Sequence, residues 1–430
     1  MRQTIHYKSF ALIIFILIAI SNSSFGQLRI DSPYSRFGLG DVNPGYNVYQ
    51  SSMGGVGYGV RDYLRISTIN PAAIAAIDSG SFVFNAAFNG LFVNTKTTSQ
   101  SGSTNYFNLS YLQFGLPVTT WWRTGGGLTP FTTVGYNVST HDNLDSIGDV
   151  RYSHLGDGGI TDIFWNNSFK IGKKLSVGIK MSYLFGNTNY RREVELTDHP
   201  YAFMYRLTNN INVKGLYLNY GLQYYTRFGK EEEYDKKKYF FGLGLIYANK
   251  QKIKSTKSAF GVTYTNGADG NEFVKDTVVD INQGDGYIVM PMKIGGGFSV
   301  GKYKKWMIAA DFTFNEFSKF SSFGINDSLS NSIRYNIGGQ YYIGKIAINA
   351  GFKYNNSYLN LNNTSINDYG ITFGVCLPLR NNANTISDVD LSFEFGRRGT
   401  TINNLIQQDY FQVRLGVNIR NTWFNRPKYL

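Results

Sequence analysis

Apolar and polar residues alternate strictly in two segments near the C-terminus, 388–396 and 410–419. The apolar positions of the first segment are Val389, Leu391, Phe393 and Phe395. Successive side chains of a β-strand point to opposite faces. Each segment is therefore predicted to be a strand with one apolar face and one face that carries polar and charged groups.

The same alternation recurs along most of the chain. Many of the alternating segments reach about ten residues, a length that suits a tilted strand crossing a membrane. Because open strand edges cannot exist in lipid, such strands must close into a barrel. We therefore predict an all-β fold, a transmembrane antiparallel β-barrel of about fourteen strands. The predicted strands are 81–96, 104–118, 125–139, 159–172, 175–187, 209–228, 239–264, 273–300, 306–320, 332–343, 346–357, 368–378, 388–397 and 409–419.

Two of these segments, 239–264 and 273–300, are longer than one crossing requires, which predicts a β-excursion outside the membrane. Tight turns such as 172–174 alternate with longer polar connections. Bacterial barrels place short turns on the periplasmic side and long loops outside, so both mature termini are predicted to be periplasmic. The predicted outer loops are 140–157, 197–208, 321–331, 359–367 and 399–408.

The N-terminus has the features of an export signal. Arg2 and Lys8 flank the start of the chain, and the apolar run 10–20 is too short to span a bilayer as a helix. A small-x-small cleavage site lies at 24–26, so residues 1–26 are predicted to be removed and the mature chain to reside in the cell outer membrane. Because the chain is exported, its net charge of +13 indicates outer-membrane lipid and lipopolysaccharide as partners, and no nucleic acid.

The first part of the mature chain does not alternate. A Gly-rich stretch at 51–59 is followed by a segment that begins like a capped helix, with Asn70 at the cap and Pro71 in the first turn. The lumen of such a barrel is too wide for wall side chains alone to fill, and the many apolar residues argue against a loose periplasmic extension. The predicted organisation is a signal peptide at 1–26, a plug at 27–79, a barrel at 80–420 and a periplasmic tail at 421–430.

Two stretches carry a resemblance to a known family. Ser52-Met-Gly-Gly-Val-Gly57, followed by Ile69-Asn-Pro-Ala-Ala-Ile74, resembles the N-terminal signature of the FadL-type long-chain fatty acid and hydrocarbon transporters, with Ala73 in place of the usual last glycine. The stretch 306–320 resembles a strand of that family, with Phe317 in place of a tryptophan. The resemblance implies a barrel of about fourteen strands, an N-terminal plug and passage of hydrophobic small molecules, often by a lateral opening in the wall.

The segments 32–41 and 421–428 look like a Bacteroidota branch of this family. In that phylum, relatives of the fold also act as non-transporting partners in secretion or barrel-assembly machinery. Two hypotheses for the function follow. The barrel passes hydrophobic or amphipathic, fatty-acid-like molecules across the outer membrane, or it is a non-transporting structural subunit of a larger outer-membrane complex for secretion or barrel assembly. The expected partners are a hydrophobic small-molecule ligand and, under the second hypothesis, other outer-membrane proteins.

Three groups of residues are expected to serve these functions. Apolar residues expected to adjoin a ligand pocket are Met53, Val56, Tyr58, Ile69, Ile74 and Phe317. The plug motif consists of Gly54, Gly55, Gly57, Asn70 and Pro71. The charged residues expected to face the lumen are Lys180, Asp311, Arg334, Lys353, Asp390, Glu394 and Arg414. Because isolated charges are costly to bury, ion pairing between strands and to Arg61, Asp62 and Arg65 of the plug is favoured over a role in selectivity.

The chain offers little catalytic chemistry. His141, His154 and His199 lie in predicted outer loops, and none has the spacing of a metal site. No spacing selects a Ser–His pair of the kind a hydrolase needs. We therefore predict no catalytic residue, no metal and no cofactor, and a protein that is not an enzyme.

Overall fold

The computed structural model describes residues 32–199, 201–229, 239–267, 271–382 and 385–422. The predicted signal peptide, the first residues of the predicted plug and nearly all of the predicted periplasmic tail lie outside these ranges. The described part of the chain contains no helix long and apolar enough to cross a membrane.

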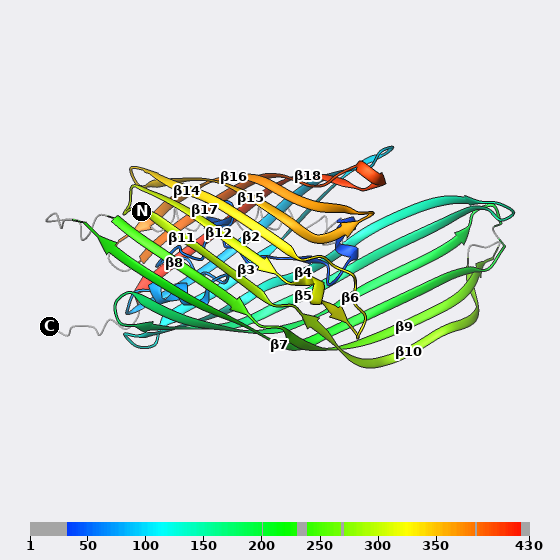
Figure 1. Ribbon diagram of the computed structural model, residues 1–430, viewed down its shortest axis with the longest axis horizontal. Helices are drawn as coiled ribbons and strands as arrows, with labels where there is room; N and C mark the ends of the chain where they lie inside the picture. Colours follow the sequence, from blue (N-terminus) through cyan, green and yellow to red (C-terminus); the bar gives the residue numbers. More distant parts are fainter. Residues whose placement is uncertain (1–31, 200, 230–238, 268–270, 383–384, 423–430) are drawn as a thin grey trace, which may run out of the picture.

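Fourteen strands form a closed antiparallel barrel, which confirms the predicted fold (Figure 1). Each strand pairs with the next one along the barrel, and the last strand pairs with the first through Gln407–Thr422 against Ser81–Lys96. The barrel strands are β2 (Ser81–Lys96), β3 (Ser101–Pro117), β4 (Trp122–Leu144), β5 (Gly148–Ile171), β6 (Leu175–Leu196), β7 (Met204–Phe228), β8 (Tyr239–Ala248), β11 (Lys293–Lys302), β12 (Trp306–Asn315), β14 (Ser332–Ile343), β15 (Ile346–Leu361), β16 (Thr364–Asn381), β17 (Thr385–Gly399) and β18 (Gln407–Thr422).

Two further strands, β9 (Gln251–Asn266) and β10 (Glu272–Met290), form a hairpin outside the ring of fourteen. Within the barrel β8 pairs with β11, whereas β9 pairs with Met204–Val213, the first part of β7. The predicted excursion is therefore present. The expectation that 239–264 and 273–300 are single strands is wrong, because the chain turns at 249–250 and again at 291–292, where Pro291 has no N–H for a ladder.

The barrel is much taller on one side than on the other. Strands β4, β5, β6 and β7 have 23, 24, 22 and 25 residues, while β8, β11 and β12 have 10 each. Together with the β9–β10 hairpin, the long strands form a one-sided wall at the end of the barrel opposite the turn 172–174 (Figure 1). The predicted loops 140–157 and 359–367 are wrong, because pairing continues through both and leaves tight turns at 145–147 and 362–363. His141 and His154 therefore lie in strands β4 and β5.

The apolar faces of the barrel strands point outward and the polar faces point inward. On β17, Phe395 is 54% exposed, whereas Asp390 and Glu394 on the opposite face are 1% and 3% exposed. Aromatic rings gather at the turn end of β4 and β5, where Trp121, Trp122 and Phe169 stack on one another. An apolar outer surface with an aromatic rim is the surface that a membrane-spanning barrel presents to lipid.

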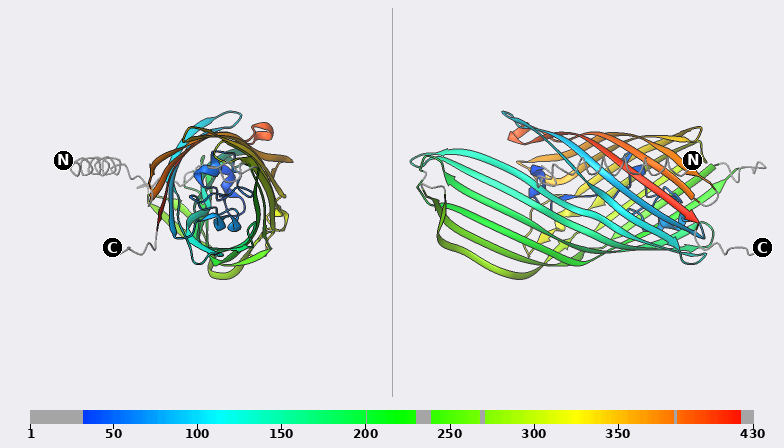
Figure 2. Two further views of the ribbon diagram at one scale, coloured as in Figure 1. Left: turned by 90° about the vertical axis from the view of Figure 1, so that its left-hand side faces the viewer. Right: turned by 180° about the vertical axis from the view of Figure 1, so that it is seen from behind.

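Residues 32–79, called the inner segment below, lie inside the barrel (Figure 2). Their short elements are η2 (Pro33–Arg36), β1 (Asp41–Val42), α2 (Val48–Ser51) and η3 (Pro71–Ala76). Outside the inner segment, η4 (Phe317–Lys319) and β13 (Ser321–Ser322) follow β12, and η5 (Ile402–Asn404) connects β17 to β18. The inner segment contributes most of the fully buried apolar side chains near the middle of the barrel.

Candidate binding site in the barrel lumen

Charged groups of the wall hold the inner segment in place. Arg65 donates to both carboxylate oxygens of Asp390, from Nε and Nη2, at 2.6 Å each. The same guanidinium also pairs with Asp388 at 3.2 Å and with Asp62 of its own segment at 3.0 Å. On another wall strand, Asp311 accepts the backbone N–H of Gly57 at 2.6 Å. These contacts satisfy charges that would be costly to bury alone.

Glycines let the backbone of the inner segment approach the wall closely. A Cβ atom at Gly338 of β14 would lie 2.1 Å from the carbonyl oxygen of Met53. A Cβ atom at Gly244 of β8 would lie 1.9 Å from the carbonyl oxygen of Tyr58. Gly54 itself has a φ of +70°, a conformation that side chains with a Cβ rarely adopt. The Gly-rich stretch and the wall glycines therefore form one contact surface.

The Asn-Pro pair of the plug motif begins a short helix, as predicted. Asn70 caps η3 by accepting the N–H of Ala72 at 3.0 Å, and Pro71 occupies the first turn. The amide of Asn70 also donates to the carbonyl oxygen of Tyr58 at 2.8 Å. Asn70 thus ties the helix to the Gly-rich stretch, and the helix is of the 3-10 type.

The strand pairing in the barrel wall is incomplete between β3 and β4. Their register covers only Leu112–Pro117 against Arg123–Leu128, although both strands continue far beyond it. A bulge in β3 opposite Ala87 and Phe88 and the proline at position 130 of β4 accompany the end of this pairing. Beyond it the inner segment covers the edge of β4, because β1 pairs with Thr132 and Thr133. We call this region the β3–β4 parting.

A cavity of about 340 Å³ lies in the lumen above the inner segment and extends to the β3–β4 parting. Tyr58 and Ile69 of the inner segment contribute to its floor, and Tyr106 and Phe131 line it beside the parting. On the far side the rings of Phe317 and Tyr358 lie 4.4 Å apart between centroids. The cavity therefore offers several aromatic and aliphatic surfaces within a volume typical of small-molecule sites, about 300–1,000 Å³.

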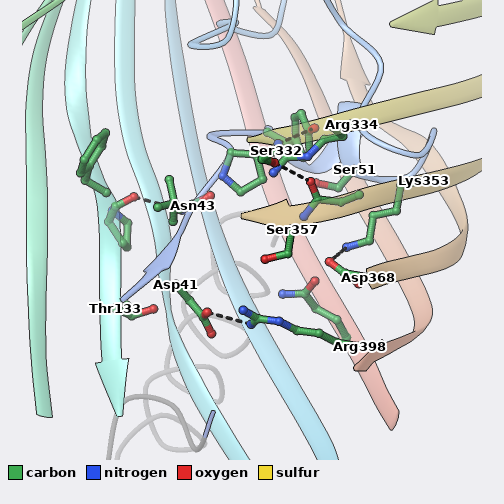
Figure 3. Close-up of a pocket in the computed structure, with 18 of the residues that line it drawn as sticks. Asp41, Asn43, Ser51, Thr133, Ser332, Arg334, Lys353, Ser357, Asp368 and Arg398 are labelled. Carbon is green, nitrogen blue, oxygen red and sulfur yellow. Dashed lines mark hydrogen bonds and ion pairs between the residues drawn. The ribbon is translucent and has the colours of Figure 1, made fainter. Parts of the chain in front are cut away.

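Charged side chains line the same cavity, with more cations than carboxylates. Two of the cations are neutralised: Arg398 pairs with Asp41 at 2.7 Å, and Lys353 pairs with Asp368 at 3.7 Å and with Glu394 (Figure 3). Asp41, Asp368 and Glu394 are the three carboxylates that line the cavity. Three lining cations form no ion pair within the described residues. They are Lys293, Arg334 and Arg414.

Two of these unpaired cations, Arg334 and Arg414, donate hydrogen bonds to neutral hydroxyl groups. Arg334 donates to the hydroxyl of Tyr46 at 3.3 Å, and Arg414 donates to the hydroxyl of Ser51. Lys293 stands at the start of β11, directly after the turn at Pro291. Because hydroxyls do not neutralise a guanidinium, the cavity keeps an excess of positive charge that an anionic group could balance.

The structure separates the predicted ligand-binding residues into two sets. Tyr58, Ile69 and Phe317 line the cavity. Met53, Val56 and Ile74 are at most 1% exposed, pack within the inner segment or against the wall and do not line the cavity. Their contact with a ligand stays a prediction. Of the plug motif, Gly54 and Gly55 reach the cavity floor.

The predicted lumen charges all lie on the inward faces of their strands, and most are paired. Lys180 pairs with Asp162 at 2.6 Å, an interaction between neighbouring strands. Of the plug residues named as partners, Arg65 and Asp62 are ion-paired as expected, whereas Arg61 lies over the ring of Tyr225 at 5.2 Å. Sequence reasoning missed Lys293, Asp388 and Arg398, since nothing in their local pattern distinguishes them from other charges near strand ends.

Comparison with solved structures shows the fold of FadL-type barrels. The CymD monoaromatic hydrocarbon channel is 14% identical and has a TM-score of 0.55, with 90% of this chain and 99% of that chain covered. The toluene transporter TodX of P. putida is 14% identical with a TM-score of 0.55 over 89% of this chain and 100% of its own. A FadL homologue of Pseudomonas aeruginosa is 11% identical with a TM-score of 0.58 over 90% of this chain and 100% of its own.

No curated protein matches the sequence. The resemblance to a Bacteroidota branch is not supported by these comparisons. A family model does match, and it covers residues 7–430, nearly the whole chain. The model is described as BamG, and the chain therefore belongs to the BamG family.

Proposed function

We propose that this outer-membrane barrel binds an amphipathic molecule with an anionic head group and an apolar, fatty-acid-like body in the lumen cavity, and passes it across the outer membrane. One observation carries the proposal. Cations without carboxylate partners, Lys293, Arg334 and Arg414, line the same cavity as Tyr58, Phe131 and Phe317. The head group would balance the excess charge, and the apolar body would contact the rings.

The β3–β4 parting supports a lateral route for the apolar body. The cavity reaches the inner side of the parting at Tyr106 and Pro130, and the outer side of β3 there carries Phe107, which is 70% exposed. A molecule leaving by this route would pass beside β1, which covers the edge of β4, and would enter the membrane without crossing the rest of the inner segment, which acts as a plug. The solved barrels of the same fold named above are described as channels for hydrophobic compounds, which supports the apolar part of the ligand.

Equilibrium binding to the full chain in lipid nanodiscs tests the proposal. A fluorescent fatty acid should bind saturably, and the double variant Lys293→Gln/Arg334→Gln should weaken binding by about a hundredfold or more, because each of the two lost charge contacts contributes about 1.5–3 kcal/mol. Lys173→Gln/Lys345→Gln, in exposed turns at the opposite end, is the matched control and should bind like the wild type. Equal affinity of all three proteins would overturn the assignment of the head-group site.

A second function is favoured by the one-sided wall. Strands β4 to β7 have 22–25 residues, about twice the roughly 9–11 residues that a tilted membrane crossing takes. Such a wall offers a large surface to other proteins of an outer-membrane secretion or barrel-assembly complex. The family model that covers the chain is described as BamG and not by a transported substrate, which is compatible with this role.

Gentle solubilisation separates the two functions. A tag placed at 325–328, in the exposed connection between β12 and β14, should recover partner proteins at fixed stoichiometry if the chain is a structural subunit. Bound lipids in the same sample are then identified by mass spectrometry. A lone barrel that retains fatty acid supports the transport function, and a stoichiometric complex whose barrel retains none supports the structural one.

A further inference from the structure

Three exposed lysines lie together where the one-sided wall leaves the membrane. Lys214 is on β7, and Lys252 and Lys254 are on β9. The two strands are paired up to Val213 opposite Ser255, so Lys214 and Lys254 occupy the next positions of the same register. The strands stay close there, because a Cβ atom at Gly215 would lie 3.2 Å from the backbone nitrogen of Lys254.

All three lysines point to the outer face of the barrel. Their neighbours Val213, Ile253 and Ser255 are buried and point inward, and successive side chains of a strand alternate. On β7 the next outward side chain toward the membrane is Leu216, which is 65% exposed. Lys214 and the lipid-facing Leu216 are therefore successive outward positions of β7, about 7 Å apart along the strand.

The height of the lysines corresponds to the lipid head groups. The stacked rings of Tyr220 and Tyr247, 6.5 Å apart, lie on the outward faces of β7 and β8, and Tyr220 is about 20 Å along β7 from Lys214. Tyrosines on the outer face of a barrel mark the border between hydrocarbon and head groups. β8 ends at Ala248, one residue past Tyr247, and β9 begins at Gln251. The lysines therefore lie beyond the tyrosines on the outer side, with Leu216 between Tyr220 and Lys214 on β7.

The lysines lack the partners that charges higher on the wall possess. Farther up, Arg206 pairs with Glu272, and Arg151 pairs with Glu195. Within the described residues no salt bridge involves Lys214, Lys252 or Lys254. Lys252 lies over the ring of Tyr287 at 5.9 Å, which positions it without neutralising it.

One carboxylate on β10 lies near this cluster. Asp285 is opposite Thr256 and two positions from Tyr287, which itself is opposite Lys254. With Asp285 counted, the surface still carries three positive charges against one negative charge. The cluster is thus cationic, exposed and placed at the head-group level.

We propose that Lys214, Lys252 and Lys254 bind a phosphate group of a phosphorylated lipid in the outer leaflet, such as lipid A, while Leu216 contacts its acyl chains. Lysine ammonium groups bind phosphate as point charges, and basic side chains near an anionic membrane surface contribute about 1 kcal/mol each. The site is on the outside of the barrel and does not depend on the lumen cavity or its ligand.

Native mass spectrometry of the full chain tests this site with lipid A as the probe. The wild type should retain lipid A through detergent release, and Lys214→Gln/Lys252→Gln/Lys254→Gln should reduce the bound fraction at least about tenfold. The control Lys173→Gln/Lys174→Gln/Lys345→Gln removes three exposed lysines from turns at the opposite end and should behave like the wild type. Heat-modifiable migration on gels establishes that both variants fold.

Two further probes identify the chemistry. Lipid A without its phosphates should bind the wild type as weakly as lipid A binds the lysine variant, and equal binding of both lipids would overturn the phosphate contact. Inorganic phosphate should compete only at concentrations far above those of the lipid. Retention of phosphate with no retention of lipid A would overturn the lipid assignment, as would unchanged lipid A binding by the lysine variant.

Discussion

Arg65 of the inner segment and Asp390 of strand β17 form a bidentate ion pair, with both nitrogen–oxygen distances at 2.6 Å. The two residues are 325 positions apart in the chain, and the side chain of Asp390 is 2% exposed. Planar guanidinium–carboxylate pairs of this kind fix orientation as well as distance. The pair therefore sets where the inner segment sits against the wall, and hence where the floor of the cavity lies.

Loss of this pair should destabilise the protein strongly. Arg65→Met leaves the buried carboxylate of Asp390 without its partner, and breaking a buried pair in this way costs about 3–5 kcal/mol. Arg397→Met is the matched control, because Arg397 pairs with Asp409 on the surface and its side chain is 46% exposed. The free energy of unfolding, measured by urea titration in lipid vesicles, should fall by at most about 1 kcal/mol in the control. Equal losses in the two variants would contradict an anchoring role for Arg65.

A single methyl group on the wall should displace the inner segment. In Gly338→Ala the new Cβ would meet the carbonyl oxygen of Met53 at 2.1 Å, a contact that only movement can relieve. In the neighbouring Gly339→Ala the nearest atom is a wall carbonyl oxygen of Met307 at 3.1 Å, so the inner segment is untouched. The thiol introduced by Met53→Cys, in a Cys376→Ala background, should react with maleimide faster only when it is combined with Gly338→Ala. Unchanged labelling rates in that combination would show that the close approach is not required.

The tip of the wall should loosen in acid. Hydrogen bonding to Arg206 lowers the pKa of Glu272 from its ordinary value of 4.5. A carboxylate whose pKa is depressed by folding contributes stability above its unfolded pKa and loses it as the pH falls through the folded value. Amide exchange of 272–280, corrected for intrinsic rates, should therefore be steady from pH 7 to about 4.5 and rise below it. In Glu272→Gln this rise should be absent, and an identical acid profile in that variant would assign the loosening to other groups.

The membrane part of the fold could be predicted because lipid imposes a regular pattern. Each strand there has an outward face that meets hydrocarbon and an inward face that meets polar groups, so alternation marks its length and direction, as with Phe395 and Glu394. Beyond the membrane neither face must be apolar. The pattern therefore predicts a loop at 140–157 where β4 and β5 in fact stay paired, since the polar residues there carry no strand period.

The candidate site was predictable only in part. The motif residues Tyr58, Ile69 and Phe317 do line the cavity, because they lie in the stretches that depart from the alternating pattern. Met53 belongs to the same stretch but packs against Gly338, a partner 285 positions away that no local pattern reveals. Lys293 begins a strand after a proline, and its place in the lumen follows only from how β8 and β11 pair.

Photo-cross-linking of a fatty acid that bears a diazirine on its chain shows whether a fatty acid occupies the lumen cavity. The purified barrel in nanodiscs is irradiated with the probe, and the labelled residues are mapped by mass spectrometry. We predict labelling of cavity residues such as Tyr106, Phe131 and Phe317, abolished by an excess of unlabelled fatty acid. Labelling confined to outward-facing side chains such as Phe395 and Leu415, with no competition, would contradict it.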